Sequence, residues 1–130
     1  MQPYKHKSAL LIDDSYIDNL ISRKILENNH FAENIIVIDS PQRAVEFITD
    51  CIKTQQNLPE IIFLDIRMPE MNGFDFLTEI NTIKGIAEQK PKIYILSSSL
   101  DPTDLKKIED HKLVTKFIGK PLTNTALEGI

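Results

Sequence analysis

The chain has 130 residues, of which 42% are hydrophobic and 26% are charged, and its formal net charge is −4. This length suits one domain with a buried core, and the acidic balance argues against a nucleic-acid backbone as the direct ligand. The lone cysteine, Cys51, excludes an internal disulfide and lies in an apolar helical pattern, which indicates a buried, inert thiol. No apolar run is long enough for a membrane span or a secretory leader, so we expect a cytoplasmic location.

The first part of the chain alternates strand and helix patterns. An apolar run at residues 8–13 predicts a strand that ends in acid, at Asp13 and Asp14. A helix is expected next, because apolar residues recur at helical spacing, and these are Ile17, Leu20, Ile21 and Ile25. A β-branched run at residues 35–38 then predicts the second strand.

Two helices are expected on either side of the third strand. Ser40 as N-cap and Pro41 in the first turn begin the earlier helix. Its expected buried face consists of Ala44, Val45, Ile48, Cys51 and Ile52. An apolar run at residues 61–65 predicts the third strand, which ends at Asp65. Gly73 begins a short helix, and its expected inward residues are Phe74, Leu77 and Ile80.

The last part of the chain repeats the alternation. Residues 93–96 predict the fourth strand, which runs into three serines that begin at Ser97. Asp101 caps a fourth helix with few apolar contacts, namely Leu105 and Ile108. Residues 114–118 predict a fifth strand, and a last helix is expected at residues 123–130.

This order of elements predicts an α/β fold, a doubly wound five-stranded parallel sheet with helices on both faces. In such a sheet, ligands bind beyond the carboxyl ends of the strands. Several polar residues fall at or just past these ends, and they are Asp13, Asp14, Asp65, Ser97 and Lys120. We therefore expect them to collect at one rim of the sheet.

Three of these residues are carboxylates, which repel one another unless a cation lies between them. Mg²⁺ takes oxygen ligands, and no histidine or cysteine lies near the pattern, which argues against zinc. The competing interpretation is that Asp13 and Asp14 only cap the helix that begins near Tyr16. The third acid at a strand end, Asp65, favours the metal site.

A carboxylate beside a metal ion can act as a nucleophile toward a phosphoryl group. Lys120 could supply a second positive charge, although a lysine is more often a plain surface residue. Pro121 permits a cis peptide bond that would aim this lysine inward. The hydroxyl of Ser97 could bind a phosphoryl oxygen, whereas Ser99 is better explained as a turn former.

The chain resembles a response-regulator receiver domain of the chemotaxis-protein (CheY-like) type. The matching segments are Leu-Ile-Asp-Asp-Ser at residues 11–15, Ile-Phe-Leu-Asp-Ile-Arg-Met-Pro-Glu-Met-Asn-Gly at 62–73, Ile-Leu-Ser-Ser at 95–98 and Phe-Ile-Gly-Lys-Pro at 117–121. They come in the family's order and cover the chain from about residue 8 to its end. The resemblance implies the flavodoxin-like strand order 2-1-3-4-5.

The resemblance also implies a role for each matching residue. Asp65 corresponds to the phosphoacceptor, Asp14 to a direct ligand of Mg²⁺ or Mn²⁺, and Asp13 to a ligand that acts through water. Arg67 corresponds to the residue whose backbone carbonyl binds the metal, and Ser97 corresponds to the switch hydroxyl. Phe117 corresponds to the switch aromatic, and Lys120 corresponds to the lysine that pairs with the phosphate. Unlike the frequent tyrosine, Phe117 has no hydroxyl.

By resemblance, the phosphoryl group comes from a sensor histidine kinase or a histidine phosphotransfer domain, in a Mg²⁺-dependent reaction. The expected docking surfaces are the loop at Pro121 and the apolar face of the first helix. Phosphorylation would then switch the surface formed by the fourth helix, the fifth strand and the last helix, for a downstream protein that the sequence does not identify. Direct contact with nucleic acid or membrane is not expected. We do not expect an enzyme beyond self-catalysed phosphorylation and dephosphorylation.

We expect residues 1–130 to form a single receiver domain, either standing alone or excised from a longer protein. The expected last helix is shorter than is usual for the family, so either the chain is truncated there or this surface is incomplete. An alternative is a pseudo-receiver that acts by protein contact without phosphorylation.

Two other classes fit less well. A phosphohydrolase of the haloacid-dehalogenase type needs a second acid where this chain has Arg67. A nucleotide-binding or flavin-binding domain needs a glycine-rich first turn, and residues 13–15 are Asp-Asp-Ser.

Overall fold

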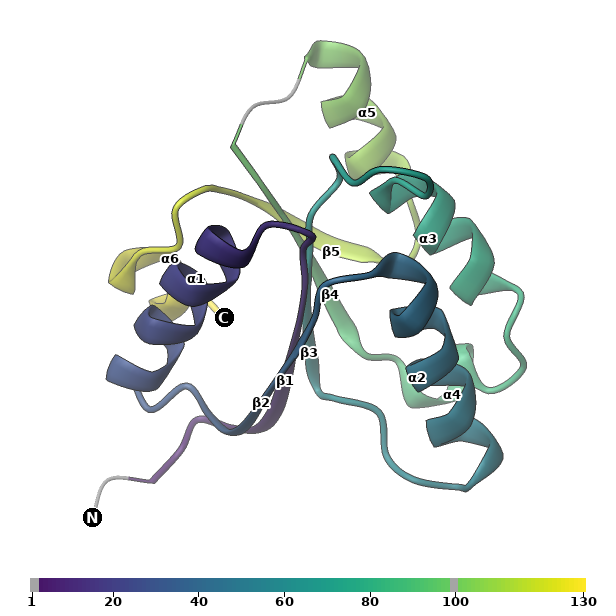
Figure 1. Ribbon diagram of the computed structural model, residues 1–130, viewed down its shortest axis with the longest axis horizontal. Coiled ribbons are helices and arrows are strands. Elements are labelled where there is room, and N and C mark those ends of the chain that lie inside the picture. The colour runs from purple at the N-terminus through teal and green to yellow at the C-terminus, as the bar shows by residue number, and fades with distance from the viewer. Residues whose placement is uncertain (1–2, 99–100) are drawn as a thin grey trace.

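The computed structural model describes residues 3–98 and 101–130, so Ser99 lies outside the described residues. Five parallel strands form one sheet in the order β2-β1-β3-β4-β5 (Figure 1). The strands are β1 (His6–Ile12), β2 (Ala32–Ile38), β3 (Ile61–Leu64), β4 (Lys92–Ser97) and β5 (Val114–Gly119). The predicted fold class and strand order are therefore confirmed.

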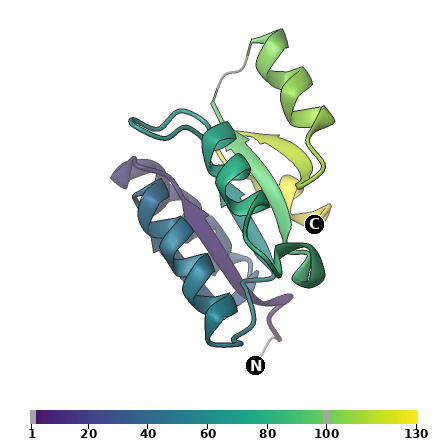
Figure 2. The same ribbon diagram turned by 90° about the vertical axis from the view of Figure 1, so that its right-hand side faces the viewer.

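Helices cover both faces of the sheet (Figures 1 and 2). One face carries α1 (Tyr16–Asn28) and α6 (Asn124–Glu128). The opposite face carries α2 (Pro41–Lys53), α3 (Gly73–Asn81), α4 (Ile86–Gln89) and α5 (Pro102–Asp110). No helix in these two described stretches is long and apolar enough to cross a membrane.

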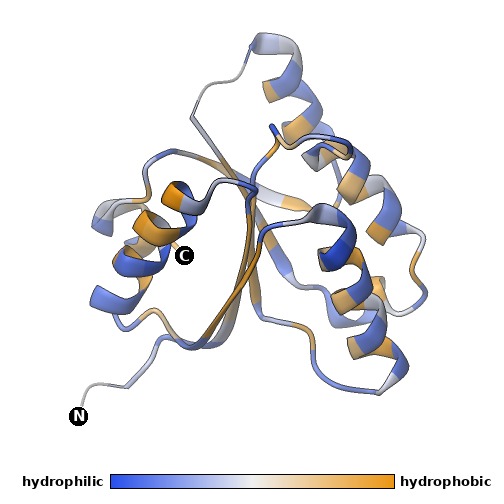
Figure 3. Cartoon of the chain, viewed as in Figure 1, coloured by the Kyte–Doolittle hydropathy of each residue, from blue (hydrophilic) through white to orange (hydrophobic). Residues whose placement is uncertain are grey.

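The sheet separates two hydrophobic cores, and Figure 3 shows hydrophobic residues along the central strands and in bands on the helices. The larger core packs strand residues such as Leu10 and Ile62 against α2, α3 and α5. The smaller core packs the opposite strand faces, including Leu11 and Phe63, against α1 and α6. Because successive strand residues point to opposite faces, uninterrupted apolar strands supply both cores.

The predicted helix starts agree with the structure at two caps. Ser40 accepts a hydrogen bond from the N–H of Arg43, and Asp101 accepts one from the N–H of Asp104. Cys51 is buried, as the apolar pattern indicated. In α3 the fully buried aromatic residue is Phe76, whereas the predicted Phe74 is only partly buried.

Two features differ from the prediction. β1 and β2 begin earlier than their apolar runs, because the polar residues at their N-terminal ends pair through the backbone, as His6 does with Ala32. The short helix α4 was not predicted. The apolar residues Ile17, Leu20 and Ile21 of α1, which were expected to form a docking face, are exposed to solvent.

Candidate metal and phosphoryl site

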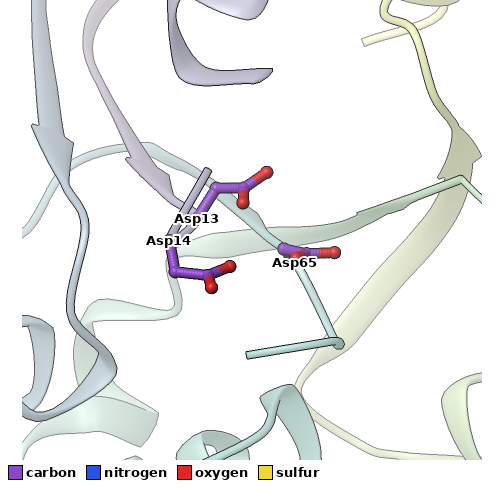
Figure 4. Close-up of side chains that lie close together, drawn as sticks. All are labelled: Asp13, Asp14 and Asp65. Carbon is purple, nitrogen blue, oxygen red and sulfur yellow. The ribbon is translucent and has the colours of Figure 1, made fainter. Parts of the chain in front are cut away.

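The acidic cluster forms where β1 and β3 end side by side. Ile12 pairs with Leu64, and the N–H of Asp65 donates to the carbonyl of Ile12 at 3.0 Å. This pairing brings oxygen atoms of Asp13, Asp14 and Asp65 within 4.8 Å of one another (Figure 4). Asp13 and Asp65 are only 5% and 6% exposed, whereas Asp14 is exposed.

The start of α1 fixes the geometry of Asp13. Ser15 is the N-cap of α1, because its hydroxyl accepts a hydrogen bond from the N–H of Asp18 at 3.2 Å. The N–H of Ser15 donates to the Asp13 carboxylate at 2.9 Å, and the Asn19 side chain donates to the Asp13 carbonyl at 2.7 Å. The competing interpretation, that Asp13 and Asp14 serve as the caps of α1, is therefore wrong.

Lys120 extends into the cluster from the end of β5, and its peptide bond to Pro121 is cis. Its ammonium Nζ donates to Asp13 at 2.7 Å and to Asp18 at 2.8 Å. The distance from Nζ to the nearest oxygen of Asp65 is 3.6 Å. Asp18 was not predicted to belong to the site. Its one signal is its position in the first turn of the helix that follows the Asp13-Asp14 pair.

The charges at this site shift two pKa values. Burial and the neighbouring Asp13 raise the pKa of Asp65 from 3.8 to about 6, although Lys120 and hydrogen bonds from the loop backbone act to lower it. Burial alone would lower the pKa of Lys120. Hydrogen bonds to Asp13 and Asp18, together with the charges of Asp13 and Asp65, outweigh burial and raise it from 10.5 to about 12.

The loop after β3 packs tightly against the start of α3. The N–H of Gly73 donates to the carbonyl of Ile66 at 2.9 Å. A Cβ atom at Gly73 would lie 2.9 Å from both the Asp65 carbonyl oxygen and the Ile66 Cα, which is too close for any residue with a side chain. The Arg67 side chain points to α5 and donates to Asp104 at 2.9 Å.

The two residues expected to switch lie on the β4–β5 side of the sheet. Ser97 is buried at the end of β4, and its carbonyl accepts a hydrogen bond from the N–H of Lys120 at 2.9 Å. Phe117 pairs with Ile95 and is partly buried against the larger core. Phe117 also lines a cleft of about 370 Å³ between α5 and β5.

The chemistry of the donors suits a hard divalent cation. All three residues of the cluster offer carboxylate oxygens, which are the ligands that Mg²⁺ prefers. Burial and, after it, the neighbouring Asp13 carboxylate raise the pKa of Asp65, and a cation would relieve the repulsion between these two carboxylates. The cluster therefore fits a magnesium-type ion better than zinc.

Curated relatives match this chain over part of their own length. Two-component response regulator ORR1 of Oryza sativa subsp. japonica is 28% identical over 117 residues, which are 88% of this chain and 49% of that protein. Protein-glutamate methylesterase/protein-glutamine glutaminase 3 of Burkholderia thailandensis is 35% identical over 79 residues, which are 61% of this chain and 20% of that protein. The chain thus spans less than half of each of these relatives.

Solved structures share the fold. A two-component response regulator from Cytophaga hutchinsonii is 32% identical, with a TM-score of 0.87 over 97% of this chain and 93% of that one. The receiver domain of the histidine kinase CKI1 from Arabidopsis thaliana, complexed with Mg²⁺, is 20% identical, with a TM-score of 0.78 over 92% of this chain and 87% of that one. The family model for the response regulator receiver domain matches residues 9–129. The chain therefore belongs to the response regulator receiver domain family.

Proposed function

We propose that Asp65 is the phosphoacceptor of a two-component phosphorelay. One observation carries this proposal: the carboxylates of Asp13 and Asp14 and the ammonium of Lys120 surround Asp65 at the carboxyl ends of the strands. A carboxylate oxygen of Asp65 attacks the phosphorus of a phosphohistidine on a sensor kinase or phosphotransfer protein. The phosphorus–nitrogen bond breaks, and the imidazole leaves with the bonding electron pair.

The residues that would hold Mg²⁺ are Asp13, Asp14, Asp65 and the backbone carbonyl of Arg67. Bound there, the ion supplies positive charge for the phosphoryl oxygens. Lys120 supplies the second positive charge from the β5 side of the site. The transfer then depends on placement and charge neutralisation, because Asp65 is already ionised at neutral pH with a pKa of about 6.

The signal would pass from the site to the surface formed by α5, β5 and α6. A phosphoryl group adds negative charge and three strong acceptors, and we expect the hydroxyl of Ser97 to move toward it. Phe117 would then fill the space that Ser97 leaves. The cleft beside Phe117 supports this proposal, since it gives the α5–β5 surface room to repack. The phosphoryl group shifts the equilibrium only through its differential affinity for the two arrangements.

The docking surface for the phosphodonor would be α1 and the loop at Pro121. Ile17, Leu20 and Ile21 are 65%, 54% and 45% exposed, which is unusual for apolar residues of one helix. These side chains lie on the helix whose first turn adjoins the acidic cluster. We propose that this reaction takes place in the cytoplasm.

The proposal is tested by intact-mass measurement after incubation with acetyl phosphate, with and without Mg²⁺. Wild type should gain one phosphoryl group only with Mg²⁺, as the Asp65 oxygen displaces acetate. Asp65→Asn should gain none. Asp50→Asn removes an exposed carboxylate near the end of α2 and should behave as wild type. A folded wild-type protein that gains nothing would favour the pseudo-receiver, which acts by protein contact alone.

A further inference from the structure

Asp18 is a fourth carboxylate at the site, and the acidic cluster does not include it. Asp18 lies in the first turn of α1, where Ser15 fixes its backbone N–H. Its side chain is 40% exposed and accepts a hydrogen bond from Nζ of Lys120 at 2.8 Å. The residues whose oxygens cluster within 4.8 Å are Asp13, Asp14 and Asp65. Asp18 thus contacts the lysine from outside the cluster.

The ammonium group of Lys120 is hydrogen-bonded to two of the three carboxylates around it. Asp13 and Asp18 accept hydrogen bonds at 2.7 and 2.8 Å, whereas the nearest Asp65 oxygen lies at 3.6 Å, beyond hydrogen-bond distance. The Lys120 and Asp13 side chains are only 12% and 8% exposed, so water screens their contact weakly, whereas it screens the contact with the 40% exposed Asp18 more. The ammonium therefore lies closer to Asp13, which follows β1, and to Asp18 of α1 than to Asp65.

We propose that Asp18 is a positioning residue that restrains Lys120 on the α1 side of the site. This restraint weakens the contact between the Lys120 ammonium and a phosphoryl group at Asp65. This inference rests on the proposed function. A phosphoryl oxygen must compete with the Asp18 carboxylate for an N–H of the same ammonium group. Of the three carboxylates within 4 Å of the Lys120 ammonium in the described structure, Asp18 is the one that lies outside the acidic cluster.

The contact between Asp18 and Lys120 lies beside the surface on which a partner would dock. Asp18 and Lys120 line a cleft of about 250 Å³ between α1 and the loop after β5, together with Ile21 and Pro121. Ile17, which belongs to the exposed apolar face of α1, immediately precedes Asp18 in the sequence. Residues that set the strength of the lysine–phosphoryl contact and residues that face a partner are therefore neighbours on one helix turn.

The test measures binding of beryllium trifluoride, a phosphoryl mimic, by calorimetry at saturating Mg²⁺. Asp18→Asn should bind it roughly three- to tenfold more tightly than wild type, because the neutral amide competes weakly for the ammonium. Asp18→Glu keeps the charge and should restore affinity close to wild type. Asp50→Asn removes an equal charge far from the lysine and should leave affinity unchanged. Far-UV circular dichroism confirms that each variant is folded.

A second readout reports on the lysine itself. The ¹⁵N resonance of the Lys120 ammonium should move in unliganded Asp18→Asn and stay near its wild-type position in Asp18→Glu. Unchanged or weaker binding by folded Asp18→Asn would overturn the restraint, as would an unmoved lysine resonance. Absence of any Asp65-dependent binding by wild type would instead overturn the proposed function, so the two failures are distinguishable.

Discussion

Asp65 carries its negative charge at a cost to the folded protein. Burial and the Asp13 carboxylate raise its pKa from 3.8 to about 6. Because the folded pKa lies above the unfolded value, folding takes up a proton between these pH values, and stability falls as the pH rises through this window. At neutral pH the ionised Asp65 therefore costs roughly 1–3 kcal/mol in the absence of metal.

Asp65→Asn should consequently stabilise the metal-free protein. We expect a gain in the free energy of unfolding of roughly 1–3 kcal/mol at about pH 7.5, shrinking toward zero near pH 4, where the wild-type side chain is also neutral. Urea denaturation in the presence of a chelator, followed by circular dichroism, measures this difference. Asp50→Asn should show no such pH-dependent gain. A gain of the same size at both pH values would contradict the electrostatic explanation.

At the scale of the element, α1 combines an exposed apolar face with a buried one. Leu20 is 54% exposed and Leu26 is fully buried in the smaller core, although both are leucines of the same helix. A helix that only had to pack would bury its apolar stripe. The exposed stripe is therefore not required for folding, which agrees with a role in binding another protein.

The two leucines provide a matched pair of substitutions. Leu26→Ala should lower the free energy of unfolding by about 2–5 kcal/mol, because it leaves a cavity in the core. Leu20→Ala should change it by no more than about 0.5 kcal/mol, since it removes a solvated side chain. Urea denaturation of both variants tests this contrast. A loss above about 2 kcal/mol for Leu20→Ala would show that α1 packs through this face.

Elements were predictable where local chemistry alone determines them. Caps such as Ser40 and Asp101 are recognisable because one side chain satisfies one backbone N–H. The N-terminal ends of β1 and β2 were not predicted, because their polar residues join the sheet through backbone pairing. A hydropathy pattern does not report such pairing. The four-residue helix α4 was missed as well, since it lacks a side-chain cap and begins after Gly85 in a left-handed conformation.

At the scale of the whole molecule, parallel topology made the acidic cluster predictable. Carboxyl ends of neighbouring parallel strands meet at one edge, so acids that follow β1 and β3 must lie close together. Asp18 was not predictable in the same way. Its contact with Lys120 joins residues 102 positions apart and depends on how α1 packs beside the end of β5, which no local pattern encodes.

The acidic cluster exists only in the folded chain, because Asp13 and Asp65 are brought together by strand pairing. A cation held there binds the folded state alone and stabilises it by RT ln(1 + [L]/Kd). Mg²⁺ at tenfold its Kd should therefore raise the free energy of unfolding of wild type by about 1.4 kcal/mol. The stabilisation should be largely lost in Asp65→Asn and retained in Asp50→Asn. Urea denaturation in MgCl₂ and in KCl of matched ionic strength separates specific binding from screening, and equal stabilisation of all three proteins would contradict a site at this cluster.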